Sequence, residues 1–317
     1  MRIGVVGAGG IGGFLAAALA RSGLPVTVVA RGTHLAAIQR EGLRVESDLG
    51  SFTQRVEAAD DLRALGDFDV LLLTFKAHQW SGLLEQMRFV AETAVTIVTL
   101  QNGLPFWYVR EPPVESVDAG GAIGSLFGDE HVIGGVVHVS GQLVEPGFVR
   151  QSGGLRYVLG EPGGGGSERV ATLVEVFRRA GLAAELDTNI RATVWLKLVN
   201  NCGLNSVSVL RRATIKPMLA DAGARAQVRG LMIEALRVGQ AMKVVSNVDV
   251  DARIEYAARL DDVKTSTLQD YERGRRLEVE PILGAVIELA ERHDVSVPNL
   301  RAAYAALQQA ATAGPAG

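Results

Sequence analysis

The chain is poor in cysteine: Cys202 is the only one among its 317 residues. A single cysteine excludes an internal disulfide framework and fits a reducing compartment. The five histidines are scattered, and the sequence contains neither an HExxH nor a CxxC pattern, so we expect no bound metal. Aromatic residues make up only 5% of the chain, so the core must consist mainly of aliphatic side chains.

An excess of positive charge is also missing, because 32 Lys and Arg are set against 35 Asp and Glu. A net charge of -3 argues against nucleic acid as a partner. The sequence has no uninterrupted apolar run of the ~18–20 residues that a bilayer span requires. Glycines break the apolar stretch at residues 3–20, which is therefore not interpreted as a signal peptide. We expect a cytoplasmic protein without a membrane partner.

The remaining composition is that of a globular protein, with 48% hydrophobic and 21% charged residues, and the length suggests two domains. In the first half, short apolar runs alternate with segments of helical periodicity, which indicates a parallel sheet covered on both faces. The sequence from 120 to 166 is glycine-rich and favours short hairpin strands. We predict an α/β fold: a Rossmann-type doubly wound sheet in an NADP-binding domain, residues 1–187, and an all-helical substrate and catalytic domain, residues 188–317.

Six residues near the N-terminus have the spacing of a dinucleotide-binding loop. They follow a predicted strand and open a predicted helix, which is the context that gives the G-x-G-x-x-G pattern its meaning. The helix start would offer free N–H groups and a positive dipole to the phosphates of a cofactor. The candidate cofactor-binding residues of this loop are Gly7, Ala8, Gly9, Gly10, Ile11 and Gly12.

The residue after the second predicted strand distinguishes the two nicotinamide cofactors. An NAD site usually has an acidic residue there, but this chain has Arg31, which can pair with a 2′-phosphate. We therefore predict NADP(H); the alternative is an arginine with no ligand. Lys76 and Asn102 follow later apolar runs and should reach the same sheet edge. Each also has a simpler explanation, as a solvated loop lysine and as part of an Asn-Gly turn.

The predicted helix at 189–209 is apolar on nearly every side, except for Lys197, Asn201 and Asn205. These three lie at i, i+4 and i+8 and form one polar stripe. Buried amides and a buried lysine need partners, so the stripe is expected to face a cleft that holds a polar ligand. Desolvation lowers the pKa of a lysine toward the working pH, which suits a general acid. The alternative is a helix whose polar face meets water.

Three further positions have plain structural interpretations. Ser266 begins a capping-box pattern and is most simply a helix N-cap. Glu278 precedes Glu280-Pro281, where acidic residues favour the first turn of a helix. Cys202 is next to the polar stripe and is interpreted as a small core residue.

Together these motifs resemble the ketopantoate reductase (2-dehydropantoate 2-reductase) family, in family order over nearly the whole chain. The matching segments are Gly7–Gly12, Arg31, Lys76-Ala77-His78-Gln79, Gln101-Asn102-Gly103, Trp195-Leu196-Lys197-Leu198-Val199-Asn200-Asn201, Asn205, Ser266-Thr267-Leu268-Gln269-Asp270, Glu278 six residues before Gly284, and Val297-Pro298-Asn299.

The resemblance implies that NADPH delivers hydride to the C2 ketone of a small 2-oxo acid, ketopantoate in the leading case, in pantothenate biosynthesis. It implies that Lys197 donates the proton to the carbonyl oxygen and that Glu278 orients the substrate and supports Lys197. It also implies substrate contacts for four residues and cofactor contacts for two. Those contacting substrate would be Asn102, Asn201, Asn205 and Ser266; those contacting cofactor, besides the glycine loop and Asn102, would be Arg31 and Lys76.

Two departures from the family pattern bear on the substrate. Thr267 stands where many members have Met, and Pro281 replaces an aromatic residue and could bend the helix entry. The alternatives are therefore an NADP-dependent 2-hydroxy-acid or β-hydroxy-acid dehydrogenase with another substrate, and a non-catalytic NADP(H)-sensing module. A homodimer remains open on sequence grounds.

Overall fold

The computed structural model describes residues 1–93, 95–259 and 262–315. The chain forms two compact units, of which unit 1 is Met1–Gln101 with Ala122–Arg191, and unit 2 is Asn102–Gly121 with Ala192–Gly317. The predicted division at 187/188 therefore differs from the observed one in two ways. The later crossing comes at 191/192, and an earlier segment, residues 102–121, belongs to the helical unit.

Unit 1 is built on one mixed sheet of ten strands, in the order β4-β3-β9-β8-β7-β6-β1-β2-β5, with β10 paired to β9. The strands are β1 (Ile3–Val6), β2 (Val26–Val29), β3 (Leu43–Ser47), β4 (Gly50–Gln54), β5 (Glu57–Ala59), β6 (Val70–Leu73), β7 (Thr96–Thr99), β8 (Val132–Glu145), β9 (Phe148–Gly160) and β10 (Ala183–Leu186).

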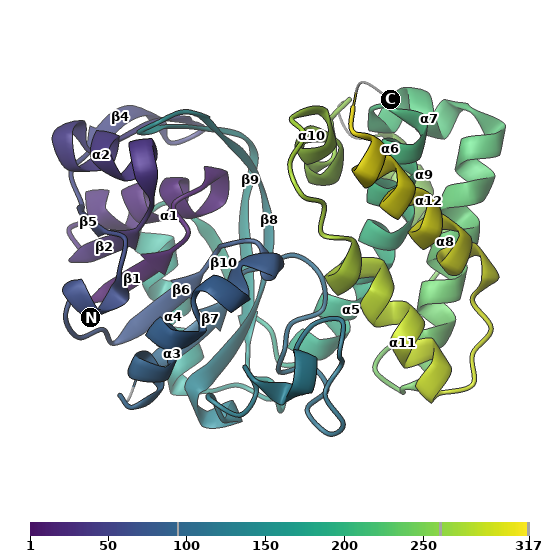
Figure 1. The fold of residues 1–317 in the computed structure, drawn as a ribbon, viewed down its shortest axis with the longest axis horizontal. Helices are drawn as coiled ribbons and strands as arrows, with labels where there is room; N and C mark the ends of the chain where they lie inside the picture. The colour runs from purple at the N-terminus through teal and green to yellow at the C-terminus, as the bar shows by residue number, and fades with distance from the viewer. Residues whose placement is uncertain (94, 260–261, 316–317) are drawn as a thin grey trace. The chain divides into compact units, whose positions relative to one another are not determined.

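The parallel part of this sheet confirms the sequence prediction. β1 pairs in parallel with β2 on one side and with β6 on the other, and β6 pairs with β7. Strands β1, β2 and β6 are buried along their whole length, which is why their sequences are continuously apolar rather than alternating. The predicted short hairpin strands are in fact two long ones, β8 and β9, the long curving strands of Figure 1.

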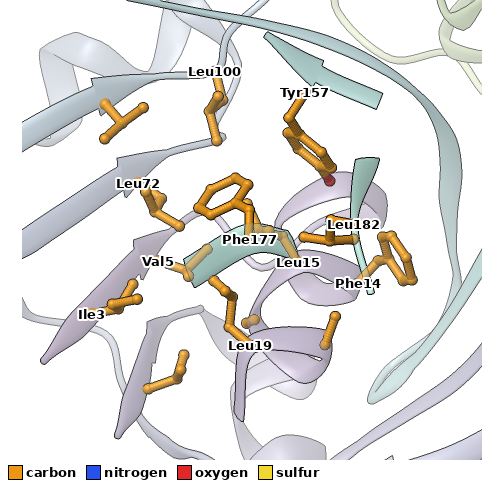
Figure 2. Packing of buried hydrophobic residues seen from close by; sticks show 14 of the residues in the cluster. Ile3, Val5, Phe14, Leu15, Leu19, Leu72, Leu100, Tyr157, Phe177 and Leu182 are labelled. Carbon is orange, nitrogen blue, oxygen red and sulfur yellow. The ribbon is translucent and has the colours of Figure 1, made fainter. Parts of the chain in front are cut away.

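Helices α1 (Gly10–Arg21) and α4 (Glu168–Arg179) share the main core of unit 1. Figure 2 shows Leu15 of α1 and Phe177 of α4 among strand residues such as Val5 and Leu72. The Tyr157 ring meets Phe177 edge to face, with ring centroids 5.3 Å apart. The other helical segments of this unit are α2 (Gly32–Glu41), η1 (Leu62–Ala64), η2 (Ala77–Gly82), α3 (Leu84–Ala91) and η4 (Asp129–His131).

Unit 2 is helical, as predicted. Helix α5 (Ile190–Asn200) begins at the end of unit 1 and continues into unit 2. The other segments of unit 2 are η3 (Ala119–Gly121), η5 (Asn201–Asn205), α6 (Ser206–Arg211), α7 (Ile215–Ala220), α8 (Ala222–Ala241), α9 (Val250–Arg259), α10 (Ser266–Glu272), η6 (Glu280–Gly284), α11 (Ala285–Arg292) and α12 (Pro298–Ala313). Segments η5 and η6 are π-helical. None of the described helices has both the length and the apolar character needed to cross a bilayer.

Close packing explains why α5 is apolar on most sides. The indole of Trp195 is fully buried and donates a hydrogen bond to the carbonyl oxygen of Ala235 in α8, at 3.0 Å. A Cβ atom on Gly239 would lie 2.1 Å from that indole, so α8 can approach α5 only with glycine there. The helix that contains the polar stripe is therefore fixed by its close packing against α8.

Candidate functional site

The glycine loop between β1 and α1 has the geometry that the spacing predicts. Gly7 has φ +100°, a left-handed conformation that favours glycine, and a Cβ atom on it would lie 2.7 Å from the Phe75 nitrogen. The Thr74 hydroxyl, at the end of β6, hydrogen-bonds to the Gly7 carbonyl oxygen at 2.8 Å. A Cβ on Gly12 would clash with both groups at 2.2 Å. Gly12 thus lets α1 lie directly against the loop.

The start of α1 is open in the way that a phosphate site requires. Gly9 is its N-cap, and no side chain of the described residues caps the helix. Its first turn also lacks an acidic residue. A Cβ on Gly9 would have no described atom within 4 Å, so there is free space in front of the helix start. Unpaired N–H groups, the helix dipole and this space fit the pyrophosphate of a dinucleotide.

The two positively charged residues that are predicted to bind the cofactor follow the strands on either side of β1. Arg31 follows β2 as the N-cap of α2, and Lys76 follows β6 as the N-cap of η2. Arg31 is exposed, and its Nη2 is 3.4 Å from the carbonyl oxygen of Gly82, the last residue of η2. The structure therefore brings Arg31 beside the segment that Lys76 begins. The absence of an acid in the first turn of α2 leaves this place favourable for a 2′-phosphate.

Asn102 is predicted to lie at the sheet edge that contains the glycine loop and Arg31. The structure places Asn102 at the first position of unit 2. Its loop is docked on η6, because the Leu104 amide donates to the Pro281 carbonyl oxygen at 2.7 Å. Gly103 has φ +87°, and a Cβ on it would lie 2.6 Å from that same oxygen. The chain bends at the Asn-Gly pair, and this bend fixes Asn102 next to the segment following Glu278.

The polar stripe is preserved, although its helix is not a regular α-helix. Lys197 lies half-buried in the last turn of α5, Asn201 is buried in η5, and Asn205 ends η5. In an α-helix a turn holds about 3.6 residues, so side chains at i, i+4 and i+8 drift gradually around the helix axis. A π-helical turn holds more than four residues, which produces a drift in the opposite direction. The π-segment therefore compensates the drift, and the Asn205 amide donates to Asn201 Oδ1 at 3.4 Å. π-segments inside helices often mark functional sites.

The capping role predicted for Ser266 is wrong. Thr265 is the N-cap of α10, and its hydroxyl accepts from the Leu268 amide at 3.1 Å. Thr265 is itself held by the Ser208 hydroxyl at 2.6 Å, and Ser208 donates to the Asn205 carbonyl oxygen at 3.0 Å. Ser266 is exposed and free of capping, and this chain of bonds ties the start of α10 to the end of the stripe.

Glu278 is buried, with 6% of its surface exposed, and lies two residues before η6. Pro281 has no N–H to donate and so favours the irregular helix entry seen there. The predicted effect of this proline on the helix entry thus has a structural counterpart. Segments η5 and η6 pack on each other, and the Cys202 thiol lies 3.9 Å from the Ile282 carbonyl oxygen. Burial raises the pKa of Cys202, which is a core residue as predicted.

Several supporting residues were not predicted. Thr74 and His34 hold the glycine loop, and Gln101 holds the loop that contains Lys76, by donating to the Phe75 carbonyl oxygen at 2.9 Å. Each of these bonds is made by a polar side chain at a strand end or helix start. Polar residues at strand ends and helix starts are common, and the sequence does not show which of them contact a functional loop in the folded chain.

A Rossmann-type unit with an uncapped glycine loop, joined in one chain to a helical unit with an aligned Lys-Asn-Asn stripe, defines a nicotinamide-dependent oxidoreductase. The comparisons narrow this class. Residues 3–164 match the family model described as "Ketopantoate reductase PanE/ApbA", and residues 189–311 match "Ketopantoate reductase PanE/ApbA C terminal". The chain belongs to the ketopantoate reductase family.

Individual relatives agree with this assignment over the full length. A 2-dehydropantoate 2-reductase of Mesorhizobium japonicum is 40% identical over 98% of both chains. One of Halobacterium salinarum is 29% identical over 95% of this chain and 96% of its own. A crystal structure of 2-dehydropantoate 2-reductase from Geobacter metallireducens has a TM-score of 0.87 at 31% identity, covering 98% of this chain and all of that one.

Proposed function

We propose that the protein reduces 2-dehydropantoate (ketopantoate) to pantoate with NADPH, a step of pantothenate biosynthesis. The relative that is 40% identical over 98% of the chain supports this substrate over other 2-oxo acids. When bound, NADPH supplies the hydride that reduces the C2 ketone. The observation that carries the proposal is the aligned stripe of Lys197, Asn201 and Asn205, because a half-buried proton donor beside two amides has a use in ketone reduction.

In this proposal unit 1 binds the cofactor. The amides at the start of α1 hold the pyrophosphate, and the residues that form this contact are Gly7, Ala8, Gly9, Gly10, Ile11 and Gly12. Arg31 pairs with the 2′-phosphate, and Lys76 adds a second positive charge from the neighbouring loop. Asn102 contributes to cofactor binding as well as to substrate binding.

Unit 2 acts on the substrate. As negative charge grows on the ketone oxygen, the Lys197 ammonium stabilises it and then donates a proton. Glu278 orients the substrate and supports Lys197. Asn102, Asn201, Asn205 and Ser266 hydrogen-bond to the polar groups of the 2-oxo acid, and the docked position of Asn102 and the capping-free hydroxyl of Ser266 support these roles.

We further propose that the protein works in the cytoplasm, because its one cysteine fits a reducing compartment. A homodimer is the expected assembly. Sedimentation equilibrium would test it against the 33.6 kDa chain: about twice that mass supports the dimer, and the monomer mass rejects it.

The test of catalysis is Lys197→Ala, followed by NADPH absorbance with ketopantoate as substrate. We expect kcat to fall by about 10²- to 10⁴-fold, with NADPH binding unchanged. Lys216→Ala is the matched control, since Lys216 is an exposed lysine of the same unit. Equal rates for Lys197→Ala and wild type would reject the catalytic role. A panel of 2-oxo acids tests the substrate, and turnover of another acid without turnover of ketopantoate would reject the pantoate assignment.

A further inference from the structure

His34 connects three parts of unit 1 that lie far apart in the sequence. It sits in the first turn of α2, three residues after Arg31, and is half-buried. Its Nε2 is 2.7 Å from the carbonyl oxygen of Ala8 in the glycine loop. Its Nδ1 is 2.9 Å from the amide nitrogen of Gly147, at the tip of the β8–β9 hairpin.

The partners of the ring determine where its proton lies. A backbone N–H can only donate, so Nδ1 must accept from Gly147 and carry no hydrogen. The proton is therefore on Nε2, which donates to the Ala8 carbonyl oxygen. The neutral ring thus satisfies both neighbours at once. A protonated ring would place a second N–H against the N–H of Gly147 and break that bond.

The Ala8–Gly9 peptide is fixed at both ends by this arrangement. His34 holds its carbonyl oxygen, and its N–H, on Gly9, donates to the Gly7 carbonyl oxygen at 2.8 Å. The plane of this peptide sets the direction of the amides that follow at the start of α1. The hairpin also touches this place, because a Cβ on Gly10 would lie 2.4 Å from the Gly141 carbonyl oxygen.

We infer that His34 is a positioning residue for the cofactor: by its bond to Ala8 it keeps the glycine loop in the conformation that binds the pyrophosphate. The inference rests on the proposed function, since it assumes that NADPH binds at this loop. His34 touches no reacting atom, so its loss should weaken NADPH binding and leave the chemical step intact.

In the described part of the chain the charges around His34 are few, and those other than Arg31 form ion pairs. The glycine loop carries none. At the end of β8, Glu145 is paired with Arg44 of β3 at 2.5 Å. On α2, Arg40 is paired with Glu41 at 2.8 Å, and Arg31 lies beside Gly82. Burial lowers the pKa of His34, while its bond to Ala8 opposes that shift in part. The neutral ring therefore predominates at neutral pH.

Two conservative variants separate the two bonds of the ring. In His34→Gln the side-chain amide can replace Nε2–H and donate to Ala8. In His34→Asn the side-chain oxygen can replace Nδ1 and accept from Gly147, but the bond to Ala8 is lost. NADPH binding is measured directly by fluorescence titration, with kcat, KM for NADPH and the thermal midpoint recorded for each variant. His131→Gln is the control, because His131 lies in η4 and its Nδ1 is near the Val95 carbonyl oxygen.

We expect His34→Asn and His34→Ala to raise the Kd of NADPH about 3- to 10-fold, with kcat at saturating NADPH unchanged. His34→Gln and His131→Gln should bind as wild type does. Equal Kd values for His34→Asn and His34→Gln would overturn the inference, as would a fall in thermal midpoint without any change in Kd. No NADPH binding by the wild type would instead reject the proposed function.

A pH series adds a second readout. The neutral ring is favoured in the folded protein, so its contribution is complete above the ordinary pKa of 6.5 and is lost as the pH falls through the lower folded-state pKa. Binding by the wild type should weaken at low pH more than binding by His34→Gln. The 2′-phosphate titrates near about pH 6 in both proteins and cancels in the comparison. Parallel pH profiles would contradict the role of the ring.

Discussion

Replacing Gly103 by alanine tests whether the Asn102 loop is held on the helical unit as the structure indicates. Gly103 has φ +87°, and the left-handed conformation costs an alanine about 1–2 kcal/mol. The new Cβ would lie 2.6 Å from the Pro281 carbonyl oxygen, so the loop must also move. That movement breaks the 2.7 Å bond from Leu104 to Pro281 and adds about 1–2 kcal/mol. We expect a total loss of about 2–4 kcal/mol.

The measurement is equilibrium urea unfolding, with Gly120→Ala as the matched control. Gly120 has φ +63° in the same unit, and a Cβ on it would have no described atom within 4 Å. Gly120→Ala should lower the free energy of unfolding only by the cost of the left-handed backbone conformation, about 1–2 kcal/mol. In Gly103→Ala we also expect a higher KM for ketopantoate and a higher Kd for NADPH, because the proposed contacts of Asn102 with both molecules move with the loop. Equal destabilisation of the two variants would refute the argument, since it would mean that the Pro281 contact contributes nothing.

Three other predictions follow from separate contacts. Arg31→Ala should raise the Kd of NADPH about 10- to 100-fold and that of NADH little; titration with both cofactors checks this, and equal losses would contradict the 2′-phosphate contact. Tyr157→Phe should stabilise the protein by about 1 kcal/mol in urea unfolding, because the buried hydroxyl has no hydrogen-bond partner in the described part of the chain; destabilisation would show a missed partner. Burial raises the pKa of Glu288, but amide hydrogen bonds from Ser116 and Glu115 outweigh this and lower it. Its stabilisation is therefore present above the ordinary pKa of 4.5 and lost as the pH falls through the folded-state value, so the urea midpoint should fall less with acid in Glu288→Gln than in wild type.

The sequence predicts the central sheet well because of burial. Strands β1, β2 and β6 are covered on both faces, so their apolar runs are unambiguous. Strands β3 and β4 were missed, because their residues are partly exposed and β4 has no continuous apolar face. Their position is set by pairing with each other and with β9, which is distant in sequence.

The candidate site was predictable where residue type and spacing carry the chemistry, as in the glycine loop and the Lys197 stripe. It was not predictable where a tertiary contact chooses between equivalent neighbours. Thr265 and Ser266 can both cap a helix, and the Ser208 hydroxyl selects Thr265. His34 finds its second partner in Gly147, 113 residues away, and no local pattern announces such a bond.

The docking of residues 102–121 on α11 has a consequence for biosynthesis. Arg292 donates to the Pro112 carbonyl oxygen at 2.7 Å, and the two residues are 180 positions apart in the chain. At a translation rate of about 5–20 residues per second, the earlier segment emerges about 10–40 s before the helix that receives it. Throughout that interval the segment lacks its bonds to Glu288 and Arg292, and its apolar residues, Trp107 and Tyr108 among them, are not yet buried as they are in the complete fold. A ribosome-bound nascent chain stalled before α11 should therefore be a preferred chaperone client.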